Sequence, residues 1–171
     1  MQAEIIVSIP CRDWLTDLPE AAAVTRTAAA AALEAAPESD RPVEVGVLLT
    51  DDGAAGRLNR EYRGKDGATN VLSFSVGDAP ADRTGGPLLL GDIVLAYGVV
   101  ADEARCQGKT LRAHLCHLTV HGVLHLLGHD HEAPAAASDM EAREVAILAA
   151  LGIADPYQPP DTDGVGGGVD G

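Results

Sequence analysis

The chain has 171 residues, enough for one domain with a substantial core, and 46% of them are hydrophobic while only 3% are aromatic. An aliphatic core is therefore expected, and no apolar run reaches the length of a membrane span. The formal net charge of −14 argues against a polyanionic partner unless a local basic patch exists, so neither a DNA partner nor a membrane partner is expected.

Strands and helices alternate in the first half of the chain. In chain order, the patterns predict a strand at 3–9, a helix at 20–36, a strand at 43–49, a helix from about 50 to 62, and strands at 70–76 and 88–96. Pro10 ends the first strand, and Thr50, Asp51 and Asp52 are N-cap candidates for the second helix. Gly91, followed by Asp92, interrupts the last strand.

Helices dominate the second half of the chain, and they are predicted at 98–106, 110–127 and 138–151. Gly128 suits a left-handed stop, and Ser138 is predicted to cap the last helix. Residues 1–155 are predicted to form a single domain, and 156–171 a disordered acidic tail rich in Gly and Pro. This order of elements predicts an α+β fold in which helices cover a small mixed four-stranded sheet. The predicted helix at 110–127, which carries a candidate metal-binding motif, is expected to be central.

The cysteines and the N-terminus bear on location. Cys11, Cys106 and Cys116 form no CxxC pair and are interpreted as reduced thiols. The opening MQAEIIVSIP has no Lys or Arg before its short apolar run and does not follow a signal-peptide pattern. Both features favour a cytoplasmic protein.

The stretch HGVLHLLGHDH, residues 121–131, carries three histidines at a metal-site spacing. His121 and His125 are four residues apart on a predicted helix, so they share one face. Gly128 ends that helix and lets His131 return as a third ligand. Three imidazoles leave one position of a tetrahedral ion open, which is the catalytic pattern, and one zinc ion per chain is expected. Copper or nickel also suits these donors.

Other polar residues of this region receive supporting roles. His129 breaks the ligand spacing, while His114 and His117 lie upstream on about the same face and are interpreted as supporting or packing groups. Asp130 is interpreted as a turn cap or as an orienting partner of an imidazole rather than as a base.

Gly122 occupies the position at which HExxH zinc hydrolases carry their glutamate base. Zinc lowers the pKa of bound water to about 7 without a carboxylate. RNA also carries its own nucleophile, the 2′-hydroxyl. The motif is therefore more compatible with phosphodiester cleavage than with peptide cleavage.

Three blocks resemble the YbeY family of bacterial endoribonucleases that mature ribosomal RNA. HGVLHLLGHDH resembles the family's HGxLHLxGxDH signature, and AHLCHLTVHG extends it upstream. LNREYRGKDGATNVLSF, residues 58–74, resembles LNxxYRxxxxxTDVLSF, and LLGDIVLA, residues 89–96, resembles the LLGDI strand. The last helix and LGIADPY also fit. His129 and Asn70 stand where the family usually has Tyr and often has Asp.

The resemblance implies a single-domain α+β fold, a zinc ion held by His121, His125 and His131, and metal-dependent cleavage of single-stranded RNA. It implies a role in 3′-end maturation of the small-subunit (16S) rRNA and in ribosome quality control. The partners implied are rRNA and the ribosome or ribosomal proteins. Arg63 matches the arginine of the family's LNxxYR block, which belongs to the active-site groove.

A phosphodiester needs positive charge on its oxygens as the bond breaks. Arg57, Arg60, Arg63 and Lys65 lie in one short stretch, and such a run is usually a solvated helix face. Because Arg63 falls in a block that resembles the family's, it is interpreted as the catalytic residue that contacts phosphate.

Two other functions remain open. A non-enzymatic ribosome assembly factor would use zinc structurally and residues 57–65 only to grip RNA. A metalloprotease-like hydrolase is disfavoured by Gly122. The acidic net charge predicts weak affinity for naked RNA, so partner proteins are expected to deliver the substrate.

Overall fold

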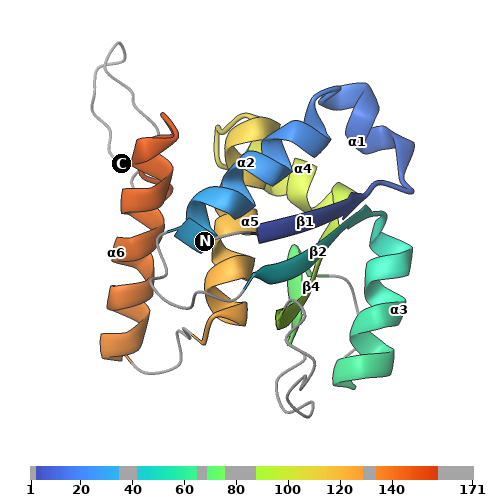
Figure 1. Ribbon diagram of the computed structural model, residues 1–171. Helices are drawn as coiled ribbons and strands as arrows, with labels where there is room; N and C mark the ends of the chain where they lie inside the picture. Colours follow the sequence, from blue (N-terminus) through green and yellow to red (C-terminus); the bar gives the residue numbers. More distant parts are fainter. Residues whose placement is uncertain (1–2, 35–41, 65–68, 76–87, 129–133, 158–171) are drawn as a thin grey trace, which may run out of the picture.

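The computed structural model describes residues 3–34, 42–64, 69–75, 88–128 and 134–157 (Figure 1). Four strands form one mixed sheet in the order β1-β2-β4-β3. They are β1 (Ala3–Ser8), β2 (Val43–Thr50), β4 (Leu88–Ala96) and β3 (Val71–Ser75). The first three are parallel, and β3 pairs with β4 in the antiparallel sense. The α+β fold with a mixed four-stranded sheet is therefore confirmed.

Six helices lie around this sheet in the described part of the chain. They are α1 (Arg12–Asp17), α2 (Ala21–Glu34), α3 (Asp52–Arg63), α4 (Tyr97–Cys106), α5 (Leu111–Leu126) and α6 (Pro134–Ala150). Helices α2 and α5 pack on one face of the sheet, α6 packs on α5, and α3 covers part of the opposite face (Figure 1). Helix α5, which carries the first two motif histidines, is therefore central, as predicted.

The main core lies between the sheet and α2 and α5. On β2, alternate residues such as Val45 and Leu49 are fully buried in this core, while the residues between them face the side of α3. A smaller cluster under α3 joins Ala55 to Leu72 and Val94. Trp14 is the only aromatic residue among the described residues that are buried in the two clusters, in agreement with the low aromatic content. No helix in the described ranges is long and apolar enough to cross a membrane.

Helix α1 is absent from the sequence prediction. Its six residues are too few to display a helical period, yet Trp14 is fully buried and its Nε1 donates a hydrogen bond to the Thr50 carbonyl at 3.1 Å. This one contact ties α1 to the end of β2.

Two boundary predictions were wrong in detail. Ser138 does not cap α6, because the helix begins at Pro134, and proline is tolerated in the first turn of a helix. Strand β4 is not broken at Gly91. Its register against β2 shifts there, and Gly91 adopts a φ of 142°, so the feature is a bulge within a continuous strand.

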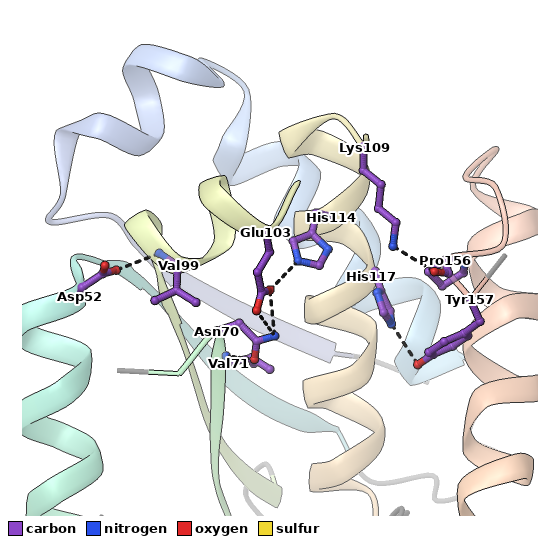
Figure 2. A network of polar contacts seen from close by, with 10 residues as sticks. All are labelled: Asp52, Asn70, Val71, Val99, Glu103, Lys109, His114, His117, Pro156 and Tyr157. Carbon is purple, nitrogen blue, oxygen red and sulfur yellow. Dashed lines mark hydrogen bonds and ion pairs between the residues drawn. The ribbon is translucent and has the colours of Figure 1, made fainter. Parts of the chain in front are cut away.

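The packed domain extends past its predicted end at residue 155. Lys109 Nζ donates a hydrogen bond to the Pro156 carbonyl at 3.0 Å, and the Tyr157 ring packs edge-on against His117 (Figure 2). The domain therefore includes Pro156 and Tyr157, and the rest of the predicted tail, residues 158–171, lies outside the described residues.

Helix α5 is held at both ends and along its length. The Thr110 hydroxyl accepts a hydrogen bond from the Ala113 N–H at 3.0 Å, and Gly128 beyond the C-terminus has a φ of 103°, which confirms the predicted left-handed stop. Gly122 faces the sheet. A Cβ at this position would lie 2.9 Å from Ile93 Cγ2, so glycine lets the helix approach β4 closely.

A polar network around Glu103 holds the segment before β3 in place. Glu103 on α4 accepts hydrogen bonds from Asn70 Nδ2 at 3.0 Å and from His114 Nε2 at 2.8 Å (Figure 2). The Asn70 side-chain oxygen accepts the Val71 N–H at 2.6 Å. Burial lowers the pKa of His114 although the hydrogen bond to Glu103 opposes it, so the imidazole is neutral and its Nε2–H is the donor. Asn70 therefore acts as a donor to a carboxylate here.

We expect Gly122→Ala to destabilise the fold. Overpacking against Ile93 costs about 1–3 kcal/mol, while helix propensity returns about 1 kcal/mol. A net loss of up to about 2 kcal/mol should appear in chemical denaturation. In an Ile93→Ala background, where the contacting methyl groups are gone, the same change should cost nothing. Equal costs in the two backgrounds would contradict the packing explanation.

We expect Asn70→Asp to destabilise the fold by about 1–3 kcal/mol near neutral pH, because the donor to Glu103 becomes a second negative charge. Repulsion raises the pKa of the introduced carboxyl in the folded state above its unfolded value. The folded state then binds the extra proton more tightly, so the penalty should shrink as the pH falls towards about 4. Thermal unfolding at several pH values measures this. Asn70→Ala is the control, and a penalty for Asp with the same pH dependence as that for Ala would contradict the charge argument.

Candidate metal centre

His121 and His125 are neighbours on the C-terminal half of α5. Their ring centroids are 4.9 Å apart and their planes meet at 73°. The His121 side chain is 22% exposed, so the pair lies at the edge of the core, within reach of a ligand from solvent. The i, i+4 spacing has therefore brought the two imidazoles together on one face.

The third predicted ligand, His131, lies outside the described residues, together with His129 and Asp130. Within the described ranges, no group of three or more His, Cys, Asp or Glu side chains is arranged to hold a metal ion. The assignment of His131 as the third ligand therefore stays a prediction.

Glu144, on α6, is a fully buried carboxylate that contacts the histidine face of α5. Its Oε2 lies 2.7 Å from His121 Nδ1, and its Oε1 lies 3.0 Å from His117 Nε2. The Tyr157 hydroxyl also donates to Oε1. Burial by itself raises the pKa of Glu144, but the hydrogen bonds from His117, His121 and Tyr157 outweigh it and lower the pKa to about 2.

The ionised carboxylate determines the tautomer of His121. Because Glu144 only accepts hydrogen bonds, His121 Nδ1 carries the proton, and Nε2 is the nitrogen with the lone pair. A carboxylate on the distal nitrogen of an imidazole is the usual support of a metal-ligating histidine. Of the two ring nitrogens, Nε2 is therefore the one through which His121 could bind a metal ion.

Sequence reasoning did not identify Glu144. It assigned an orienting role to Asp130 and supporting or packing roles to His117 and His114, and the structure shows His117 in contact with Glu144. A signal was present, because Met140, Glu144 and Leu148 recur every four residues, and both apolar members are buried. A lone glutamate on the buried face of a helix requires a polar partner.

Arg63 is the last residue of α3, followed by Gly64 in the left-handed conformation with a φ of 69°. Helices α3 and α5 both run towards the same end of the molecule, on opposite faces of the sheet (Figure 1). Arg57 and Arg60 are exposed on α3. The Arg63 side chain and Lys65 do not belong to the part of the chain that the structure describes. The phosphate contact of Arg63 therefore stays a prediction.

A cavity of about 620 Å³ lies on the face of the sheet beside α3. Exposed apolar side chains, including Ile6, Tyr62 and Leu89, line it together with Glu44 and Asp92, and among the described residues that line it none is histidine, lysine or arginine. Negative charge at this cavity disfavours phosphate. The histidine pair is therefore the better candidate for phosphodiester chemistry.

The sequence matches the family described as Endoribonuclease YbeY over residues 11–152. A relative of that name from Paramagnetospirillum magneticum is 53% identical over 156 residues, covering 90% of this chain and 95% of the relative. A second, from Rhodospirillum rubrum, is 49% identical over 152 residues, covering 84% and 76% respectively.

The fold is similar to the solution structure of TM1509 from Thermotoga maritima, with a TM-score of 0.50 and 20% identity over 92% of this chain and 99% of that chain. That likeness supports the fold alone. The family match, in contrast, covers Arg63, Glu144 and the whole histidine motif. On the extent of this match and the identity of the relatives, the chain belongs to the YbeY family.

Proposed function

We propose that this chain is a metal-dependent endoribonuclease that cleaves single-stranded RNA. The observation that carries the proposal is the His121–His125 pair on α5, with the Glu144 carboxylate bonded to His121 Nδ1. Membership of a family whose curated relatives are named endoribonucleases supports the reaction class.

Zinc is the proposed metal, one ion per chain, held by His121, His125 and His131. The donor set fits, because imidazole nitrogens suit zinc and because Glu144 supports His121 in the way that metal-ligating histidines are usually supported. When bound, zinc supplies Lewis acidity towards water and phosphate oxygens.

The chain's own residues supply positioning and charge. Glu144 holds the His121 ring and its proton at Nδ1. Arg63 is proposed to bind the phosphate, since its planar guanidinium can donate two parallel hydrogen bonds to phosphate oxygens. Gly122 offers no general base, which suits RNA, whose 2′-hydroxyl is a nucleophile within the substrate itself.

We further propose that the substrate is rRNA, that the protein acts in small-subunit (16S) rRNA 3′-end maturation and ribosome quality control, and that it works in the cytoplasm. The net charge of −14 favours substrate delivery by the ribosome or by ribosomal proteins over tight binding of naked RNA.

The alternative candidate is a non-enzymatic ribosome assembly factor with a structural zinc, in which residues 57–65 only grip RNA. A metalloprotease-like activity is disfavoured further, because a side chain at residue 122 would collide with Ile93.

We expect the purified protein to contain about one zinc ion and to cleave labelled single-stranded RNA. Chelation should abolish cleavage and added zinc should restore it. His125→Ala should reduce bound zinc well below one ion per chain, because a four-ligand ion loses one protein donor. His129→Ala, in the same motif but outside the proposed ligand set, is the matched control. Full zinc retention by His125→Ala would show the ligand assignment to be wrong.

We expect Arg63→Ala to retain zinc and the fold but to lower the rate of RNA cleavage about 30-fold to 1,000-fold, which corresponds to about 2–4 kcal/mol of transition-state stabilisation. Arg63→Lys should recover only part of the rate, because an ammonium cannot reproduce the bidentate contact. Arg60→Ala, one turn away, should have a smaller effect that weakens with added salt. Cleavage at the parent rate by zinc-loaded Arg63→Ala would favour the assembly-factor alternative.

A further inference from the structure

The chain beyond α6 turns back along α5 and is fixed there by several contacts. The Ile153 N–H donates to the Leu148 carbonyl at 2.9 Å, and Lys109 Nζ donates to the Pro156 carbonyl at 3.0 Å. The Tyr157 N–H donates to Asp155 Oδ1 at 2.8 Å. The segment therefore reaches Tyr157 in a defined conformation, anchored to the residues just before the start of α5 (Figure 2).

Tyr157 is a partly exposed residue whose hydroxyl reaches the buried Glu144 carboxylate. The residue as a whole is 46% exposed, but its ring packs edge-on against His117 with centroids 5.3 Å apart. Its hydroxyl donates to Glu144, whose side chain is fully buried. Burial and the neighbouring carboxylate raise the pKa of Tyr157 well above its usual range, so the hydroxyl keeps its proton and acts as the donor.

The three hydrogen-bond donors to Glu144 bind different oxygens of its carboxylate. His117 and Tyr157 both bind Oε1, and His121 alone binds Oε2. A buried carboxylate requires several donors to offset its lost hydration. With Oε1 occupied by Tyr157 and His117, the carboxylate is held in the rotamer that presents Oε2 to His121 Nδ1.

We propose that Tyr157 is a positioning residue of the metal centre: it holds Glu144 in place, and Glu144 in turn holds the His121 ring with its proton on Nδ1. The C-terminal segment Asp155–Tyr157 is then part of the site rather than the start of a dispensable tail. This inference rests on the proposed zinc site, and it assigns a role to the LGIADPY motif that the proposed reaction leaves without one.

The test compares Tyr157→Phe with Tyr97→Phe in the full-length chain. Tyr97 also donates to a carboxylate, that of Asp17, but it does so at the contact between α4 and α1, away from the motif. Both changes remove one tyrosine–carboxylate hydrogen bond and keep the ring. Zinc affinity is measured by competition with a chromophoric chelator, and the His121 tautomer in the zinc-free protein by long-range nitrogen–proton NMR.

We expect Tyr157→Phe to weaken zinc binding about threefold to tenfold and to increase the share of His121 protonated at Nε2. Glu144→Gln, which changes the direct partner, should weaken binding about 10-fold to 100-fold. Tyr97→Phe should alter neither quantity, even if it lowers the melting temperature as much as Tyr157→Phe does.

Parent-like zinc affinity and an unchanged His121 tautomer in Tyr157→Phe would overturn the inference and leave the proposed function intact. If the parent protein bound no zinc, the proposed function would fail. The tautomer of His121 in the zinc-free variants would then decide the inference by itself.

Discussion

Helix α5 can lie close to the sheet only because residue 122 has no side chain. Ile93 fills the space in which a Cβ would lie, and the Ser73 hydroxyl donates to the Gly122 carbonyl at 3.3 Å, so both β4 and β3 contact the helix at this level. These contacts fix the distance of α5 from the sheet and its rotation about its own axis. They do so at residue 122, which is next to His121. The glycine at the position of the HExxH glutamate therefore meets a packing requirement, and it also removes the general base.

The other side of α5 faces α6, where the contact is polar. Burying an isolated carboxylate costs several kcal/mol, and the donors on Glu144 offset this cost. His117 and Tyr157 therefore stabilise the α5–α6 contact, and the same hydrogen bonds orient His121. The proposed metal centre and the α5–α6 contact therefore share one set of hydrogen bonds, so substitutions at Glu144 are expected to affect both.

The distribution of charge bears on how an acidic protein approaches RNA. Only three of the 26 acidic residues, Asp161, Asp163 and Asp170, lie beyond Tyr157, so most of the negative charge belongs to the folded domain. Glu44 and Asp92 place part of it at the cavity beside β1 and β2. The proposed phosphate contact therefore depends on the few arginines of α3, which agrees with the proposal that a larger assembly delivers the substrate.

Much of this protein could be predicted from its sequence. Period-two and period-3.6 patterns predicted all four strands and the five longer helices, because those patterns reflect which residues face a core. The spacing of His121 and His125 predicted a shared helix face by local geometry alone. Tertiary structure decided the rest. Helix α1 is too short to show a period, Glu144 is 23 residues from His121 along the chain, and Tyr157 is 13 residues further on. Such partners meet only when α6 packs on α5, and no local pattern encodes that packing.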